Sequence, residues 1–309
     1  MPDSLRGWLG LLRPVRALAR PEYLYRPAQL WRRLRRAAIL ERGDVRLAWG
    51  LPIEIDMPGF VSADILNLGI YDRIVPEAIC RLLEAGEFAV DVGANVGQNA
   101  CVMAVIAGPR GRVLAFEPHP GLRQILERNV ARWRHHALAA IETVPHALSS
   151  SAGAAYLYED EEFAHNRGSA SLEVPSVVVR RHTVELTTLD SWVSDDVSIG
   201  LAKLDVEGHE RAVLEGAVRL LASGRLRDLI FEDLAPHASP VTGMLEALGY
   251  SVFALCSPWH KPRLMPHGDG ARRRFHTHNY LATLDPARAH ARFRAPGWRC
   301  LRLRAATAA

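Results

Sequence analysis

Three short groups of polar residues each follow an apolar run, and their side chains could bind a small molecule. The first is the segment Asp91–Gln98 (DVGANVGQ), which follows the run Phe88–Val90. Glycines let a ligand approach the backbone closely, and free N–H groups at a helix N-terminus bind anions. The segment lacks the Gly-x-Gly-x-x-Gly spacing of dinucleotide-binding turns, because Asn95 stands where the second glycine would be, and no P-loop Gly-Lys-Ser/Thr follows. It therefore predicts a ligand-binding turn of another class.

The second and third groups supply acids at two later strand ends. Glu117 follows the run Val113–Phe116 and precedes Pro118, and a carboxylate there can accept hydrogen bonds from both hydroxyls of a ribose. The segment Lys203–Glu210 (KLDVEGHE) holds three acids, a lysine and a histidine. Such a cluster could ligate a metal or cap the following helix. We expect no metal.

Apolar runs and helical patterns alternate from Glu87 onward, which is typical of a parallel, doubly wound sheet. The segments Ser251–Leu255 and Tyr280–Thr283 would close the sheet as an antiparallel pair. Short strands are expected within Ala154–Leu189, which interrupts the rhythm. The expected strands and helices are a strand-like stretch over 51–60, a helix over 76–85, strands over 88–91, 113–117, 141–144, 201–205 and 229–233, helices over 98–107, 121–134 and 210–223, and short strands over 177–179 and 183–186.

These elements predict an α/β fold with three regions. Residues 1–50 form a basic helical N-terminal extension, and residues 51–285 form one domain with a mainly parallel, Rossmann-like sheet of seven strands and an antiparallel closing strand. Residues 286–309 form an Arg-rich tail that we expect to be weakly ordered. Because ligands in open α/β sheets bind beyond the carboxyl ends of the strands, the three polar groups are expected to meet at one edge of the sheet.

The composition is that of a soluble globular protein, with 49% hydrophobic and 23% charged residues among 309. No apolar run reaches the roughly 18 residues of a membrane-spanning helix, and the patch Trp8–Leu12 is too short for a signal peptide. The four cysteines form no Cys-x-x-Cys pair, so they predict neither a disulfide framework nor a zinc site. We expect a cytoplasmic protein without a membrane span.

The net charge of +4 is unevenly distributed, since residues 1–46 hold eleven arginines against four acids. A basic head of this kind could contact nucleic acid or an anionic membrane surface. We favour a solvated helical lead-in and expect no nucleic-acid partner, with peripheral membrane contact as the alternative. The oligomeric state is left open by the sequence.

The three groups together resemble the FkbM-type methyltransferases, a branch of the class I S-adenosylmethionine-dependent enzymes. The family pattern Asp-Val-Gly-Ala-Asn-x-Gly, Phe-Glu-Pro-x-Pro and Lys-x-Asp-Val-Glu-Gly-x-Glu matches Asp91–Gly97, Phe116–Pro120 and Lys203–Glu210 in that order. The resemblance covers about Pro52 to Asp285 and includes Gly69-Ile-Tyr71 and the segment Asn166–Leu172. The combination is specific to the family, whereas each piece alone is not.

The resemblance implies S-adenosyl-L-methionine as the cofactor and assigns residues to it. Asp91 suits the ammonium of its amino-acid end or a bridging water, the helix N-terminus suits the carboxylate, Glu117 suits the ribose, and His146-Ala147 would lie beside the adenine. The full cofactor-binding set is Asp91, Gly93, Ala94, Asn95, Gly97, Gln98, Glu117, Pro118, His146, Ala147 and Asp205.

The acceptor side follows from the third motif and from the segment Ala154–Leu189, where loops over the sheet edge set specificity. Asp205 and His209 are the candidate catalytic residues, because a hydroxyl acceptor benefits from a base that takes its proton. His209 could equally well begin the next helix. Tyr71, His165, Asn166 and Glu207 are the candidate substrate residues.

The sequence therefore predicts an S-adenosylmethionine-dependent O-methyltransferase that acts on a hydroxyl of a sugar, glycolipid or secondary metabolite. The acceptor is expected to be a small molecule or a glycan, and its identity is left open. A nicotinamide-dependent oxidoreductase is the first alternative, because it also places a glycine turn and an acid on successive strands. A non-catalytic Rossmann-like binding module is the second.

Overall fold

An eight-stranded sheet forms the centre of the computed structural model, which describes residues 21–22, 45–55, 59–164, 169–234, 239–267 and 276–305. The predicted helical extension therefore lies largely outside the described residues. The strand order is β10-β9-β11-β8-β7-β1-β2-β3. The strands are β1 (Phe88–Val92), β2 (Arg112–Phe116), β3 (Ala140–Val144), β7 (Ile199–Leu204), β8 (Leu226–Glu232), β9 (Ser251–Cys256), β10 (Arg263–Pro266) and β11 (His276–Thr283).

The sheet is doubly wound, as the sequence predicts. Strand β1 pairs in parallel with β2 on one side and with β7 on the other, and β7 pairs in parallel with β8. The chain thus reverses its direction of travel across the sheet between β1 and β7, which is where α/β folds bind ligands. The expected closing pair is also present, since β11 runs antiparallel to both β8 and β9.

The expected count of seven strands is wrong by one. The additional strand is β10, which pairs antiparallel with β9 at the edge of the sheet. Its sequence, Arg-Leu-Met-Pro, alternates too briefly to stand out from a loop, and it forms because β9 offers an unpaired edge.

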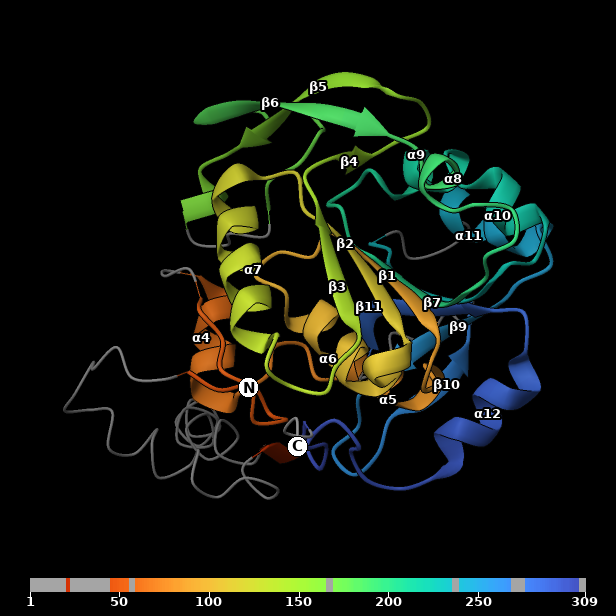
Figure 1. Ribbon diagram of the computed structural model, residues 1–309. Coiled ribbons are helices and arrows are strands. Elements are labelled where there is room, and N and C mark those ends of the chain that lie inside the picture. The colour runs from red at the N-terminus through yellow and green to blue at the C-terminus, as the bar shows by residue number, and fades with distance from the viewer. Residues whose placement is uncertain are drawn as a thin grey trace, which may run out of the picture.

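Helices cover both faces of the sheet (Figure 1). Along β1, Ala89 faces a core shared with α4–α7 and the C-terminal helix, whereas the next residue, Val90, faces a core shared with α8–α11. This alternation is what a strand buried on both faces requires. The helices are α4 (Phe60–Leu68), α5 (Ile74–Leu82), α6 (Gln98–Ala107), α7 (Pro120–Trp133), α8 (Leu189–Trp192), α9 (Glu210–Glu215), α10 (Val218–Ala222), α11 (Pro240–Ala247) and α12 (Pro286–Arg294), with short 3-10 turns at Gly108–Arg110 and Glu162–Ala164.

The helix expected over 210–223 is two helices, α9 and α10, with a break at Gly216. A Cβ atom at Gly216 would lie 2.0 Å from the carbonyl oxygen of Ser149, so the chain passes a neighbouring segment there too closely for a side chain. The turn lets the chain change direction at this contact, and the apolar pattern of the sequence does not reveal it.

Two expected strands are not formed. Val177–Val179 lie in an exposed loop, where the β-branched side chains face solvent and only the segment after them enters a strand. Within 51–60, the described residues make a single isolated bridge between Arg46 and Pro52, and α4 begins at Phe60. The alternation of Ile53 and Ile55 with acids reflects contact with the helical layer, since Ile53 is buried in the core with α4 and α5.

The expectation of a weakly ordered tail is also wrong for residues 286–305. Helix α12 packs on the sheet side that carries α5, and Trp298, Cys300 and Leu301 are buried. The fully buried Arg81 of α5 donates to the carbonyl oxygens of Arg292 and Gly297 at 2.7 and 2.9 Å, so the tail satisfies a buried cation. The arginines suggested a tail exposed to solvent, but the apolar residues between them are buried and hold the tail against the core.

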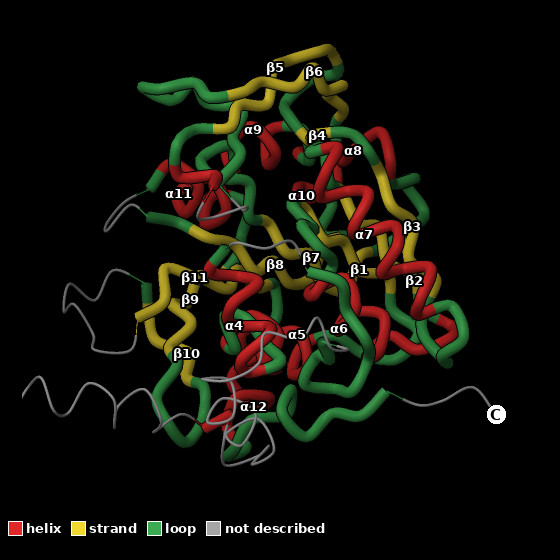
Figure 2. Tube along the Cα trace, turned by 90° about the vertical axis from the view of Figure 1, so that its left-hand side faces the viewer, coloured by secondary structure: helices red, strands yellow, loops and turns green. Residues whose placement is uncertain are grey.

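A second, three-stranded sheet is inserted between β3 and β7, with the order β4-β6-β5. Its strands are β4 (Ala147–Leu148), β5 (Gly153–Glu159) and β6 (Arg180–Thr187). Figure 2 shows this small sheet above the main sheet, and Figure 1 shows it beyond the ends of β2 and β3. The insertion thus lies over the carboxyl edge, as the sequence predicts. No helix among the described residues is long and apolar enough to cross a membrane.

Candidate active site

A cavity opens at the carboxyl ends of β1, β2, β7 and β8, and the small sheet forms part of its wall. All three polar groups singled out in the sequence contribute to it. The lining residues used below are Tyr71, Gly93, Ala94, Asn95, Gln98, Asn99, Glu117, Pro118, His146, Ala147, Lys203, Asp205, Glu207, His209 and Glu232, with Leu157, Ala170 and Leu172 from the insertion.

The glycine turn after β1 is shaped by contact with the end of β7. Gly93 has φ +75°, and a Cβ atom there would lie 2.0 Å from the carbonyl oxygen of Asp205. Gly97 has φ +95°, and a Cβ atom there would lie 2.6 Å from Leu126 of α7. Asn95, with φ +51°, is one of the few non-glycine residues in the left-handed region. Only glycine meets both demands at Gly93, so the turn brings β1 and β7 together at the cavity.

Glu117 fastens the glycine turn to the end of β2. Its two carboxylate oxygens accept hydrogen bonds from the backbone N–H of Asn95 at 2.7 Å and of His119 at 2.9 Å. Burial raises the pKa of Glu117 to about 7, although both backbone bonds favour the ionised form. Each oxygen keeps a further lone pair, so the carboxylate can still accept hydroxyl donors from the cavity.

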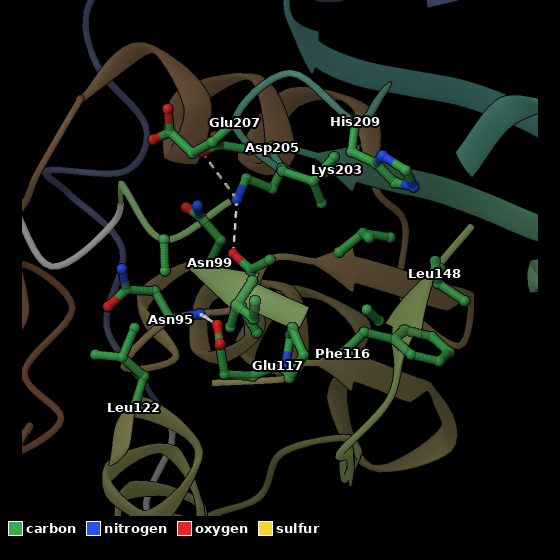
Figure 3. A pocket seen from close by; sticks show the side chains of 18 of the residues that line it. Asn95, Asn99, Phe116, Glu117, Leu122, Leu148, Lys203, Asp205, Glu207 and His209 are labelled. Carbon is green, nitrogen blue, oxygen red and sulfur yellow. Dashed lines mark hydrogen bonds and ion pairs between the residues drawn. The ribbon is translucent and has the colours of Figure 1, made fainter. Parts of the chain in front are cut away.

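Lys203 joins the glycine turn to the acids at the end of β7 (Figure 3). Its Nζ donates to the carbonyl oxygen of Gly93 at 3.0 Å and lies 3.1 Å from Oδ2 of Asp205 and 3.8 Å from Oδ1 of Asp91. Burial lowers the pKa of Lys203, but attraction to Asp205 and Asp91 outweighs this and raises it. A charged ammonium therefore lies between the two halves of the cavity.

One acceptor atom beside the glycine turn is covered from water and has no hydrogen-bond donor, namely Oδ1 of Asn99 in the first turn of α6. The fully buried Asp91 is compensated by Lys203 and by the backbone N–H of Ala100. Burial raises the pKa of Asp91 to about 6. Acceptors covered from water normally find donors, so Oδ1 of Asn99, a residue that lines the cavity, suits a ligand that brings one. The ammonium of an amino acid is such a donor, and the adjacent helix N-terminus suits its carboxylate.

The structure brings most of the predicted cofactor residues to the cavity wall. Asp91 and Gly97 are exceptions, because Asp91 lies behind the turn next to Lys203 and Gly97 packs against α7. His146 lines the cavity with Nε2 at 2.9 Å from the carboxylate of Glu185, and its ring packs against Trp192. The predicted residues that line the cavity are Gly93, Ala94, Asn95, Gln98, Glu117, Pro118, His146, Ala147 and Asp205.

The structure describes two of the four predicted substrate residues. Tyr71 and Glu207 line the cavity, and the backbone of Tyr71 is held by Gln98, which accepts from its N–H at 2.7 Å and donates to its carbonyl oxygen at 3.0 Å. His165 and Asn166 lie outside the described residues. Burial, with Asp205 next in effect, raises the pKa of Glu207 to about 7.

His209 lines the cavity and also occupies the N-cap position at the start of α9, where its side chain makes no capping bond. Its Nε2 lies 2.9 Å from the hydroxyl of Ser149, and its Nδ1 lies 3.6 Å from the carboxylate of Glu173. Glu210 holds the preceding loop instead, since its carboxylate accepts from the backbone N–H of Val206 and Gly208. His209 therefore links the main domain to the insertion.

Sequence reasoning missed two lining residues that matter for the chemistry. Glu232 ends β8 next to Asp205, and it follows an apolar run just as Glu117 and Asp205 do, so the same signal could have selected it. Asn99 lies one position beyond the motif that was examined, and nothing in the sequence distinguishes it from an ordinary helix residue.

Within the described residues, one group of side chains has the composition of a metal site, namely His119, Glu159 and His182. One carboxylate oxygen of Glu159 lies 3.1 Å from Nε2 of His119 and 2.6 Å from Nε2 of His182. Nδ1 of His119 accepts from the backbone N–H of Leu122 at 3.2 Å, which leaves the proton of a neutral ring on Nε2. Nε2 therefore donates to Glu159 and is not free to ligate a metal, so the group fastens the small sheet to the Glu117 loop.

Comparison with known proteins agrees with the geometry. The family model of the methyltransferase FkbM domain matches residues 91–252, slightly more than half of the chain. The hexuronic acid methyltransferase AglP of Haloferax volcanii is 32% identical over 149 residues, which cover 47% of this chain and 57% of that protein. The methyltransferase sdnD of Sordaria araneosa is 32% identical over 125 residues, which cover 40% and 46%. The matches thus span about half the length of each relative.

The solved structures that match the chain include two that are named methyltransferases. An S-adenosylmethionine-dependent O-methyltransferase from Thermotoga maritima has a TM-score of 0.41 and 15% identity, with 74% of this chain and 71% of that chain covered. The precorrin-6y C5,15-methyltransferase of Geobacter metallireducens has a TM-score of 0.40 and 14% identity, with 75% and 98% covered. The family match decides against the nicotinamide-dependent oxidoreductase. The chain belongs to the FkbM methyltransferase domain family.

Proposed function

We propose that this protein transfers a methyl group from S-adenosyl-L-methionine to a hydroxyl oxygen, on a sugar, a glycolipid or a hydroxylated secondary metabolite. The observation that carries the proposal is the shared cavity. It brings the glycine turn and Glu117 to one end and the acids Asp205, Glu207 and Glu232 to the other. The similarity to a hexuronic acid methyltransferase supports a sugar acceptor.

The cofactor end of the cavity offers one partner to each part of S-adenosylmethionine. Glu117 accepts from the ribose hydroxyls, and the N–H groups at the start of α6 hold the carboxylate. The donor-free oxygen of Asn99 receives the ammonium, with Asp91 behind it as a compensating charge. His146 and Ala147 flank the adenine. When bound, the cofactor supplies a methyl group on a sulfonium, so the chain mainly has to hold the acceptor in line with it.

The acceptor end is acidic and rich in hydrogen-bond acceptors. Tyr71 enters from the loop before α5, and Asp205 and Glu207 follow β7. Carboxylates suit the hydroxyls of a sugar because each oxygen accepts two hydrogen bonds. The insertion covers this end through Ala170 and Leu172, so the acceptor would be enclosed on that side. The expected independence of metal stays a prediction.

Binding and transfer test this proposal separately. Calorimetry with S-adenosylhomocysteine should show binding to the wild-type chain in the absence of any acceptor. A labelled-methyl assay should then show transfer to at least one member of a panel of free hexuronic acids, neutral glycosides and lipid-linked glycans. If S-adenosylhomocysteine does not bind, the cofactor assignment is wrong. If it binds and no hydroxyl in the panel is methylated, the acceptor class is wrong.

A further inference from the structure

Glu232 and Asp205 lie side by side at the acceptor end of the cavity. Strands β7 and β8 are parallel, with Leu204 opposite Phe231, so the residues that follow these two occupy neighbouring positions at the carboxyl edge. Both side chains line the cavity. The two acids therefore form a carboxylate pair, and two acids that share one site do not both ionise easily.

The two acids have different charged neighbours. Asp205 forms an ion pair with Lys203 at 3.1 Å, on the side that faces the glycine turn. The charged groups that act on Glu232 from the neighbouring elements are Asp205, Glu207 and Asp72, all of them acids. A proton in this group is therefore better placed on Glu232 than on Asp205.

Asn279, Tyr71 and His209 are further polar residues that stand beside Glu232 or share its cavity. On β11, Asn279 stands opposite Glu232, and its amide donates to Asp72 at 2.7 Å. Tyr71 shares the cavity, and burial together with Asp72 and Asp205 raises the pKa of its phenol, so the phenol stays protonated. His209 has a partner at each ring nitrogen, Ser149 and Glu173. Glu232 is thus the group at the acceptor end that is best placed to gain and lose a proton.

We propose that Glu232 is the general base that takes the proton of the acceptor hydroxyl, and that the charge on Asp205 increases the affinity of the Glu232 carboxylate for that proton. The inference rests on the proposed O-methylation. The acceptor oxygen forms a bond to the methyl carbon while the carbon–sulfur bond breaks. The bonding pair of the broken bond goes to sulfur, which becomes a neutral thioether, and the hydroxyl proton goes to the Glu232 carboxylate. The protonated Glu232 then donates to Asp205 until solvent removes the proton.

The pKa of Glu232 supports this role. Burial, followed by the charges of Asp205 and Glu207, raises it to about 8. A base with a pKa near the working pH combines a useful ionised fraction with strong proton affinity. Because the base has to be ionised, activity should rise as the pH increases through about 8. The sign would be the opposite for a group that acts as an acid.

The first experiment measures the proton on Glu232 in the ligand-free protein. Carbon-13 NMR of glutamate carboxyl groups should show one titration near pH 8 that is absent from Glu232→Gln. In Asp205→Asn, which removes the neighbouring charge, this titration should move to lower pH. A Glu232 that titrates in the ordinary range of glutamate in wild type, or that is unaffected by Asp205→Asn, would overturn the proposal. This measurement requires no acceptor and no turnover.

The second experiment measures transfer to whichever hydroxyl compound of the panel is methylated. Glu232→Gln should lower kcat/KM by about 10²–10⁴-fold and remove its rise with pH, while affinity for S-adenosylhomocysteine is retained. Glu232→Asp should recover part of the rate, and Glu246→Gln on the exposed face of α11 should match wild type. If the wild type methylates a hydroxyl and Glu232→Gln is equally active, Glu232 is not the base, while the proposed function stands. Wild-type protein that binds the cofactor but methylates no hydroxyl would overturn the proposed function and the base with it.

Discussion

The two ends of the cavity are built by different means. Most of the cofactor end comes from one continuous stretch, from β1 to the loop after β2, with His146 and Ala147 added after β3. Many of its contacts are made by backbone groups: the turn at Gly93, the N–H groups at the start of α6 and the two amides bound by Glu117. The acceptor end is assembled from distant segments, with Tyr71 before α5, Glu207 after β7 and Glu232 after β8. Backbone contacts fix one geometry, whereas side chains from separate segments can change independently.

This difference predicts where the protein tolerates substitution. The cofactor end should be rigid and intolerant, because each residue there also holds a turn or a strand end. The acceptor end should accept changes at some cost in rate, because its side chains come from separate segments that can change independently. Lys203 belongs to both ends, since it binds Gly93 on one side and Asp205 on the other. The following substitutions test this division, beginning with the largest expected effect.

Gly93→Ala should be the most damaging change. Its Cβ atom would meet the carbonyl oxygen of Asp205 at 2.0 Å in a backbone conformation that disfavours side chains, so β1 and β7 would have to separate. We expect a loss of at least about 4–5 kcal/mol of stability, the upper range for single substitutions. Thermal unfolding measures it, with Gly153→Ala as the control, since nothing lies within 4 Å of a Cβ atom there. Equal stability of the two variants would contradict the close contact.

Lys203→Met should be the next largest. The variant keeps the length of the side chain but leaves the buried Asp91 without its compensating charge, which we expect to cost about 3–5 kcal/mol. Chemical denaturation measures the loss. Adding Asp91→Asn should recover part of the stability, because the uncompensated charge is then removed. If the double variant is less stable than Lys203→Met alone, charge compensation is not what Lys203 provides.

Glu117→Ala should act on the cofactor end alone. The loss of charge-assisted hydrogen bonds should weaken S-adenosylhomocysteine binding by about 1.5–3 kcal/mol, or about tenfold to a hundredfold. Calorimetry gives the affinity, and circular dichroism verifies that the chain is folded. The acceptor KM should be unchanged at saturating cofactor. A larger effect on acceptor KM than on cofactor affinity would reverse the assignment of the two ends.

The fold was predictable where the sequence carries a local pattern. The apolar runs before Asp91, Glu117 and Asp205 located three strands correctly, with β1 ending one residue later than expected, and the parallel order followed from the alternation with helices. The eighth strand, the break at Gly216 and the packed tail were not predictable, because each depends on a contact with a segment far away in the chain. Trp298, for example, is buried only because α5 and the tail meet.

The site was predictable to a similar extent. Gly93, Glu117 and Asp205 were found because their motifs are contiguous and resemble a family. Asp91 was assigned to the cofactor, directly or through a water, by its motif alone. The structure buries it behind the turn, since a residue within a strand alternates in direction with its neighbours. Glu232 was missed as a site residue because its significance depends on the register of β8 against β7.

The pH dependence of stability should show the smallest effect. Partial desolvation, followed by the charge of Asp205, raises the pKa of Glu207 to about 7. The folded chain therefore binds this proton more tightly than the unfolded chain, whose glutamate titrates near 4.5. Its stabilising contribution is therefore complete below pH 4.5 and is lost as the pH rises through about 7. We expect the Tm of the ligand-free protein to fall between pH 5 and pH 8, and to fall less in Glu207→Gln, by at most a few degrees. Glu246→Gln should follow wild type, and an unchanged slope in Glu207→Gln would contradict the raised pKa of this carboxyl.

The central claim is that one cavity holds S-adenosylmethionine and delivers its methyl group to oxygen. Incubation of the protein with carbon-13 methyl-labelled S-adenosylmethionine and the acceptor panel, followed by NMR of the products, tests it most directly, because the chemical shift of the new methyl carbon identifies the atom to which it is bound. The account predicts a labelled O-methyl product that forms with wild type and decreases strongly with Glu117→Ala at limiting cofactor. A labelled N-methyl or C-methyl product, or an O-methyl product formed equally well by Glu117→Ala, would contradict it.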